Sequence, residues 1–348
     1  MNFRLSVILT ILGAAAWGGV REGDPEGPRY RWSGKAFGVC WEGAPRVIGN
    51  SEVDALASLG PNSISQTPFG WMESPTKPDL RFGKGGWWGE SEDGVRETAR
   101  LARGHQIATL LKPHIWIHNS WPGDVVMSSE EDWKTWFEGY RKFALHWAEF
   151  ARDEKLEGYC IGTELDRTVG REKEWRALIA EIRAIYPGLL TYAANWTDYE
   201  KVPFWDALDA IGVNAYFPLS EKPCPTADEL TEAWKPIAGK LKALAETHRI
   251  PVVLTEIGYH SVCGAYSKPW EWRMRDAKPH FDDQAAGYEA VARTFFHEPW
   301  FGGVFWWKWH ARRKVNEANS GDTEFTPQGK PAMAVMERYY KAASRPAK

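Results

Sequence analysis

The sequence predicts an α/β fold, a (β/α)8 or TIM barrel formed by a single domain. Eight short apolar runs alternate with amphipathic helical patterns between residues 35 and 345. The runs are apolar on both faces, as the strands of a parallel sheet covered by helices must be. A doubly wound sheet would alternate in the same way, but no glycine-rich dinucleotide fingerprint follows the first run. The count of eight therefore favours the barrel.

Each predicted strand is short, rich in β-branched or aromatic residues, and bounded by residues that favour turns. The strands are predicted at 36–41, 62–66, 107–112, 158–164, 190–196, 210–216, 251–256 and 303–309. A long loop rich in Gly and Trp is predicted after the second strand and ends at residue 89.

The predicted helices carry apolar residues at helical spacing, and several have recognisable caps. They are predicted at 51–59, 92–103, 129–153, 172–185, 204–208, 226–247, 283–297 and 331–342. The first ends at Gly60-Pro61, and Thr226 with Glu229 forms a capping box at the start of the sixth. The aromatic residues of 129–153 fall on one stripe, which indicates core packing rather than ligand binding.

Composition places the chain among globular proteins and sets one question. Its 348 residues include 43 Lys and Arg against 46 Asp and Glu, a formal net charge of −3 that gives no indication of a nucleic-acid partner. The unusual figure is the 21 tryptophans. They either build a large aromatic core or offer flat surfaces to apolar ligand faces such as those of sugars.

The N-terminus is typical of a secretory signal peptide, which we place at residues 1–16. Arg4 precedes a short apolar stretch, Leu5 to Leu12, and the small residues 14–16 form a cleavage site. Residues 17–34 are a polar lead-in, and 35–345 form the catalytic domain. We therefore expect a secreted or periplasmic protein with no stable membrane insertion after cleavage; an uncleaved anchor is the alternative.

The four cysteines form no CxxC pair, so they give no support to a zinc or thioredoxin-type site. Cys40 and Cys160 lie in predicted strands and are expected to be buried thiols. Cys224 and Cys263 lie in the loops after the sixth and seventh strands, which are neighbours in a barrel. In an exported protein these two can form a disulfide.

Polar and aromatic residues gather where the predicted strands end, which in a (β/α)8 barrel is the end that carries the chemistry. In chain order they are Lys112, His114, Glu164, Asn195, Asn214, Tyr216, Glu256 and the run 306–309. Glu164 and Glu256 stand out, because each follows an apolar strand where a charge is costly unless it faces a polar cavity.

Glu164 and Glu256 end the fourth and seventh strands, which lie across the barrel mouth from one another. Two carboxylates so placed can flank one bond, as retaining glycoside hydrolysis requires: one protonates the leaving oxygen and the other attacks the sugar. The alternative for each glutamate is a salt bridge to a Lys or Arg at a neighbouring strand end. The His, Asn, Tyr and Trp residues beside them favour the catalytic interpretation.

Several segments together resemble glycoside hydrolase family 113. They are 112–114 (KPH), 162–165 (GTEL), 211–218 (IGVNAYFP), 254–259 (LTEIGY) and 305–309 (FWWKW), and the resemblance spans about 36–340. It implies a retaining barrel enzyme of the clan with glutamates on strands four and seven, and β-1,4-mannan as the substrate class. By position, Glu164 would be the acid/base and Glu256 the nucleophile. Many clan members carry Asn immediately before the acid/base, where this chain has Thr163.

The neighbouring residues receive roles with alternatives attached. Tyr216 either orients Glu256 through a hydrogen bond or is a core tyrosine, and His114 either binds a sugar hydroxyl or bonds a loop carbonyl. Asn195 and Asn214 can both donate and accept, as recognition of hydroxyls needs. Lys112 is included in the predicted substrate-binding set.

Tryptophans complete that set. Either Trp306 or Trp307 is expected to form the floor under the cleaved sugar; adjacent strand residues point opposite ways, and we favour Trp306. Trp41 is the other predicted binding tryptophan. The loop tryptophans either line outer sugar subsites or pack the loops: Trp41, Trp71, Trp87, Trp88, Trp116 and Trp121.

The leading functional hypothesis is a retaining endo-β-mannanase acting on mannan-type polysaccharides or oligosaccharides, without a cofactor or metal. A cellulase or xylanase is an alternative, because the glutamates set the reaction and the loops set the sugar. A non-catalytic carbohydrate-binding barrel is a second alternative. A metal-dependent hydrolase is a third, disfavoured by the lack of clustered His and Asp at the strand ends.

Overall fold

The computed structural model describes residues 34–83, 85–274, 276–313 and 320–343, and its framework is a closed barrel of eight parallel strands. The strands are β1 (Ala36–Glu42), β2 (Ser63–Gln66), β5 (Ala108–Leu111), β7 (Gly158–Thr163), β8 (Leu189–Asn195), β9 (Ala210–Asn214), β10 (Val252–Ile257) and β11 (Phe301–His310). They close in the order β1-β11-β10-β9-β8-β7-β5-β2. The predicted fold and all eight predicted barrel strands are therefore confirmed.

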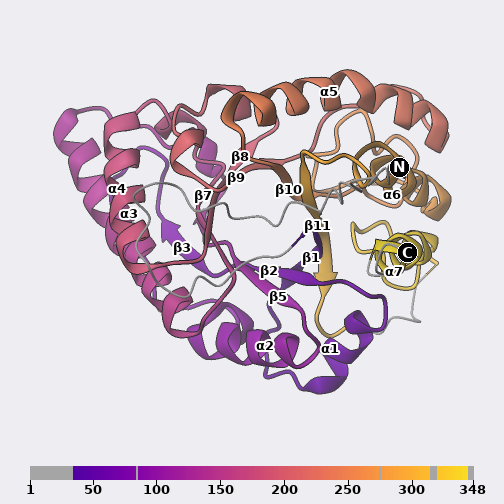
Figure 1. Cartoon of the computed structure of the whole chain (residues 1–348), viewed down its shortest axis with the longest axis horizontal. Coiled ribbons are helices and arrows are strands. Elements are labelled where there is room, and N and C mark those ends of the chain that lie inside the picture. The colour runs from indigo at the N-terminus through magenta and orange to yellow at the C-terminus, as the bar shows by residue number, and fades with distance from the viewer. Residues whose placement is uncertain (1–33, 84, 275, 314–319, 344–348) are drawn as a thin grey trace, which may run out of the picture.

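Seven helices surround the barrel in chain order (Figure 1). They are α1 (Asn50–Ala57), α2 (Glu92–Gly104), α3 (Glu130–Asp153), α4 (Glu172–Ile185), α5 (Ala227–His248), α6 (Phe281–Phe295) and α7 (Pro331–Ala343). The helix predicted at 204–208 is instead a short 3-10 turn, Trp205–Ala207.

Local sequence explains why the helices begin where they do. The Ser129 hydroxyl accepts from the Asp132 amide at the start of α3, and Thr226 and Glu229 form the predicted capping box at the start of α5. The predicted aromatic stripe of α3 is buried; for example, Trp136 and Tyr140 stack at a centroid distance of 5.0 Å. These tryptophans belong to the core.

The segments after β2 and β5 contain a second, small sheet where a loop was predicted. It consists of β3 (Phe69–Met72), β4 (Leu80–Arg81) and β6 (His114–Ile117), in the order β4-β3-β6. Burial alternates along β3 and β6, so each packs one face inward and leaves the other nearer to solvent. Strands of two to four residues are too short to give a clear periodic signal in sequence.

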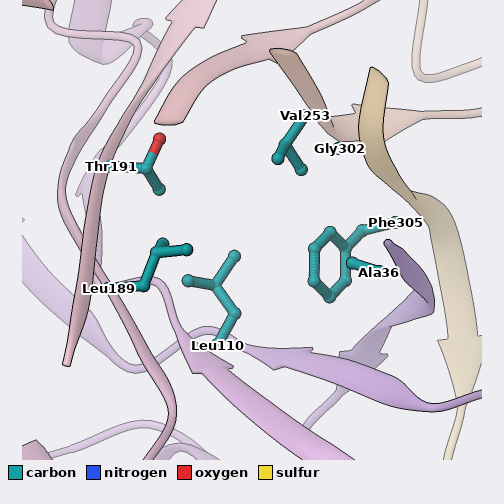
Figure 2. Close-up of a pocket in the computed structure, with 7 residues that line it drawn as sticks. All are labelled: Ala36, Leu110, Leu189, Thr191, Val253, Gly302 and Phe305. Atoms are coloured by element: carbon teal, nitrogen blue, oxygen red, sulfur yellow. The ribbon is translucent and has the colours of Figure 1, made fainter. Parts of the chain in front are cut away.

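The two ends of the barrel interior differ in polarity. Figure 2 shows a pocket in the half nearest the strand N-termini, and it carries no charged side chain. Its lining residues are Ala36, Leu110, Leu189, Thr191, Val253, Gly302 and Phe305. The hydroxyl of Thr191 is bonded to the Ala210 carbonyl at 3.0 Å. Ionisable side chains of the barrel strands gather at the opposite end, described below.

The cysteines follow their predicted pairing. Cys224 and Cys263 form a disulfide between the loops after β9 and β10, and Cys40 and Cys160 are buried free thiols. The predicted signal peptide, and the lead-in apart from Gly34, lie outside the described residues. Among the helices of the described ranges, none has the length and apolarity needed to cross a membrane.

Candidate active site

Glu164 and Glu256 both lie at the mouth formed by the strand C-termini. Glu164 is the first residue after β7, and Glu256 is the penultimate residue of β10. The Glu164 backbone has φ of 51°, a left-handed conformation that is unusual for a residue with a side chain. Its amide donates to the Ala193 carbonyl of β8 at 2.8 Å, so the neighbouring strand holds this turn in place.

The Glu164 carboxylate receives one hydrogen bond at each oxygen. The Trp121 indole N–H donates to Oε2 at 2.7 Å, and the Asn214 amide N–H donates to Oε1 at 3.0 Å. Burial raises the pKa of Glu164, and the negative charge of Glu256 raises it further, while the two donors act in the opposite direction. The net shift is upward, toward the protonated form.

Thr255 fixes the orientation of the Asn214 amide. The Thr255 hydroxyl donates to Asn214 Oδ1 at 2.9 Å, so the amide nitrogen is the group left to face Glu164. Asn214 is fully buried. The structure therefore corrects the prediction that Asn214 recognises a sugar hydroxyl: its amide connects Glu164 to the strand that carries Glu256.

Glu256 has a different set of partners. The Lys112 ammonium contacts Oε1, the Tyr216 hydroxyl donates to Oε2 at 3.0 Å, and His114 Nε2 lies 3.5 Å from Oε1. The Tyr216 bond is the contact predicted for that residue. Burial and then the Glu256 charge hold the pKa of Tyr216 well above its usual range, so its hydroxyl stays a donor.

Lys112 balances the charge of Glu256 inside the barrel. Its side chain is 0% exposed, and Nζ also donates to the Thr255 carbonyl at 3.3 Å. Burial opposes the charge on Lys112, but the Glu256 carboxylate outweighs burial and the pKa of the lysine is raised. Lys112 is therefore a partner of Glu256, and the prediction that it binds substrate is wrong because no part of it faces solvent.

His114 is held neutral beside this pair. Burial, and then the Lys112 ammonium, keep the pKa of His114 well below its usual range. The imidazole ring lies nearly parallel to Trp307, at an interplanar angle of 10° and a centroid distance of 6.5 Å. The Lys112 and Lys308 ammonium groups lie 5.9 and 5.5 Å from the Trp307 ring centroid.

The structure reverses our choice between the two tryptophans of β11. Trp306 is 1% exposed and stacks on Tyr288 of α6 at 3.6 Å, so it belongs to the layer between barrel and helices. Trp307 is the residue that turns toward Lys112 and His114. Trp41 is also buried in the large core cluster, at 2% exposed, and so offers no face to a ligand.

The remaining predicted residues lie around the mouth at different depths. Asn195, the last residue of β8, is half-buried and in register with Asn214 of β9. Trp87 and Trp116 are exposed, whereas Trp71 and Trp88 are partly buried. Trp121 reaches inward to Glu164, a contact that its sequence position in a long loop did not indicate.

A second polar cluster joins the first and last strands at the mouth. Glu42, at the end of β1, contacts both the Lys308 ammonium and the His310 Nδ1 of β11. Burial opposes the charge on Glu42, but hydrogen bonding and charge from His310 and Lys308 outweigh it and lower the pKa of the carboxyl. The sequence analysis missed Glu42; its place at a strand end was the available signal.

The donor groups offer little to a metal. Within the ranges that the structure describes, one group of His, Cys, Asp and Glu has ligand spacing: Cys224, Cys263 and His280. Two of its three donor atoms are the sulfurs of the disulfide. Lys112 occupies the side of Glu256 where a cation would bind.

The site therefore presents two carboxyl groups in unlike environments at one mouth. Glu164, with a raised pKa and neutral donors, is suited to deliver a proton. Glu256, beside an ammonium group and oriented by a phenol, is suited to attack an electrophilic carbon. Neither residue takes the alternative of a surface salt bridge at a strand end.

Comparison with known proteins gives consistent matches over most of the chain. The sequence profile of Glycoside Hydrolase Family 113 matches residues 46–330. A GH113 β-mannanase from Alicyclobacillus acidocaldarius, solved with ManMIm, is 30% identical with a TM-score of 0.80, covering 89% of this chain and 98% of its own. A GH113 β-1,4-mannanase at 22% identity has a TM-score of 0.77, covering 90% and 100%.

More distant likeness concerns the fold alone. A β-glucuronidase from Faecalibacterium prausnitzii is 13% identical with a TM-score of 0.60, and the match covers 89% of this chain and 49% of that one. No curated protein sequence matches the chain.

The Trp121 hydrogen bond can be tested through the titration of Glu164. Because the indole N–H stabilises the ionised carboxylate, Trp121→Phe is expected to raise the pKa of Glu164, measured by NMR on protein labelled at the glutamate carboxyl carbon. Trp116→Phe is the matched control, since Trp116 packs edge-on against Phe69 instead. An unchanged or lowered pKa in Trp121→Phe would show that the contact does not act on Glu164.

Proposed function

Because the chain belongs to glycoside hydrolase family 113, we propose that it hydrolyses β-1,4-mannosidic bonds by double displacement with retention. The proposed substrates are mannan-type polysaccharides or oligosaccharides. The substrate class is supported by the GH113 β-mannanase that is 30% identical over 89% of this chain. The family and the barrel favour neither a non-catalytic binding module nor a metal-dependent hydrolase.

The observation that carries the mechanism is the unlike surroundings of the two carboxyl groups. In the first step, a Glu256 oxygen forms a bond to the anomeric carbon while Glu164 gives its proton to the leaving oxygen. In the second step, Glu164 takes a proton from water, whose oxygen attacks the same carbon and releases Glu256. Activity should fall as pH rises through the pKa of Glu164, because the acid is then ionised before substrate binds.

The neighbouring groups support these steps without taking part in bond changes. Tyr216 and Lys112 hold the two Glu256 oxygens, so that the carboxylate is oriented before substrate arrives. The neutral His114 can offer a hydrogen bond without competing for the Glu256 charge. Trp307, which faces these groups, is the proposed floor beneath the sugar that is cleaved.

The substrate class is tested by measuring release of reducing ends from mannan, glucan and xylan by the purified protein. Mannan is expected to be cleaved fastest, and the first product is expected to be the β-anomer when its NMR spectrum is followed from mixing. Activity on glucan alone would contradict a mannanase, and a first product in the α form would contradict double displacement.

The two glutamates can be told apart with variants and azide on an aryl β-mannoside. Glu256→Ala is expected to lower kcat at least about a thousandfold, because the nucleophile is lost. Azide can then attack from the vacated face and give the α-mannosyl azide. In Glu164→Ala, azide displaces Glu256 from the glycosyl-enzyme and gives the β-mannosyl azide.

A matched control for these variants is Glu232→Ala on the exposed surface of α5, where Glu232 pairs with Lys235. It should retain wild-type rates. If the two active-site variants gave the opposite azide products, the assigned roles would be reversed.

We also propose that the protein is exported and that residues 1–16 are removed. The charged and apolar N-terminal pattern supports this. The Cys224–Cys263 disulfide also supports it, because such bonds persist in oxidising compartments. N-terminal sequencing of the protein from an expressing bacterial culture is expected to begin near Trp17. Full-length protein found in the membrane fraction would instead indicate an uncleaved anchor.

A further inference from the structure

Exposed tryptophans are concentrated at the active-site end of the molecule. The large apolar side chains that are exposed in the described residues are Val47 and four tryptophans: Trp87, Trp116, Trp270 and Trp272. All four tryptophans lie in segments that follow barrel strands β2, β5 and β10 at their C-terminal ends. Exposing such rings has a cost in water, so their common placement calls for a ligand at this end.

Trp270 has a backing that presents its ring as a flat surface. It stacks on Trp196 at a centroid distance of 5.2 Å and an angle of 20°, and Trp196 packs edge-on against Phe217 at 5.8 Å. Because Trp196 covers one face of Trp270, the exposed 43% of that residue lies on the other face and the edges. The pair is a stacked platform with one open side.

The loop that carries Trp270 is tied down on both sides of it. Before Trp270, the Tyr266 carbonyl accepts from the Leu219 amide at 2.8 Å, and the Cys224–Cys263 disulfide joins the same two loops. After it, the Glu271 carbonyl lies 2.9 Å from His260 Nε2. A ring held in advance loses little conformational freedom when a ligand stacks on it.

The platform lies close to the proposed acid/base. Trp196 directly follows Asn195, which is in register with Asn214, the donor to Glu164. It is also three residues past Ala193, whose carbonyl binds the Glu164 amide. At roughly 3.3 Å per strand residue, Trp196 is therefore within about 10 Å of Glu164 along the chain direction. A sugar chain leaving the cleavage point on the β8–β10 side can reach it.

We infer that the Trp196–Trp270 pair is a sugar-binding platform that holds a unit of the substrate chain beyond the one being cleaved. A pyranose ring has a flat face of C–H groups, which buries apolar area and gains dispersion contacts on an open indole face. The platform would favour long chains over single-sugar substrates. This inference rests on the proposed function and adds a location for binding outside the catalytic centre.

The test compares Trp270→Ala with wild type on a long β-1,4-manno-oligosaccharide and on a single-sugar aryl β-mannoside. On the long substrate we expect KM to rise about tenfold with kcat nearly unchanged, because the platform binds ground state and transition state alike. On the aryl mannoside, kcat/KM should be unchanged. Trp270→Tyr keeps a flat ring and should restore most of the affinity.

Trp272→Ala is the matched control, since Trp272 lies in the same loop, is 67% exposed, and packs with Arg273 rather than Trp196. It should leave KM for the long substrate unchanged. Hydrolysis by the wild type is measured first, because its absence on all β-glycans would overturn the proposed function. With an active wild type, equal KM values for wild type and Trp270→Ala would overturn this inference alone, as would an equal loss in Trp272→Ala.

Discussion

The pairing of the first strand with the last is the constraint on which the rest of this structure depends. β1 and β11 lie in parallel register from Ala36 opposite Gly303 to Glu42 opposite His310, and this pairing closes the barrel. Closure gives all eight strands the same direction, so every strand C-terminus meets at one mouth. Residues as distant in sequence as Lys112 and Glu256 come into contact there because of that geometry.

The mouth separates two carboxyl groups by their surroundings rather than by their chemistry. Glu164 is bound by neutral N–H groups and lies in a left-handed turn held by β8, whereas Glu256 faces an ammonium group. Asn214 and Thr255 connect the two environments through one fixed amide. Groups of the same kind can therefore be assigned opposite tasks, because burial and charge partners set which one holds the proton.

Sequence patterns predict those features that depend on local order. Apolar runs located all eight barrel strands, and the strand ends placed Glu164 and Glu256 at one mouth. The direction of single side chains was less accessible. Trp307, not Trp306, turns inward because register shifts between β11 and its neighbours change which residues face the axis. Trp121 reaches Glu164 through a loop whose path depends on tertiary contacts, and the short β3 and β6 strands lack enough residues for a periodic signal.

The ion pair of Lys112 and Glu256 also has a consequence for how the chain finds its fold. The two residues come from β5 and β10, and both side chains are almost fully buried. A slip of either strand by one residue would turn its side chain to the other face and leave the opposite charge alone in the interior. An unpaired buried charge of this kind costs about 3–5 kcal/mol. The residues that equip the site for chemistry therefore also proofread the register of the barrel during assembly.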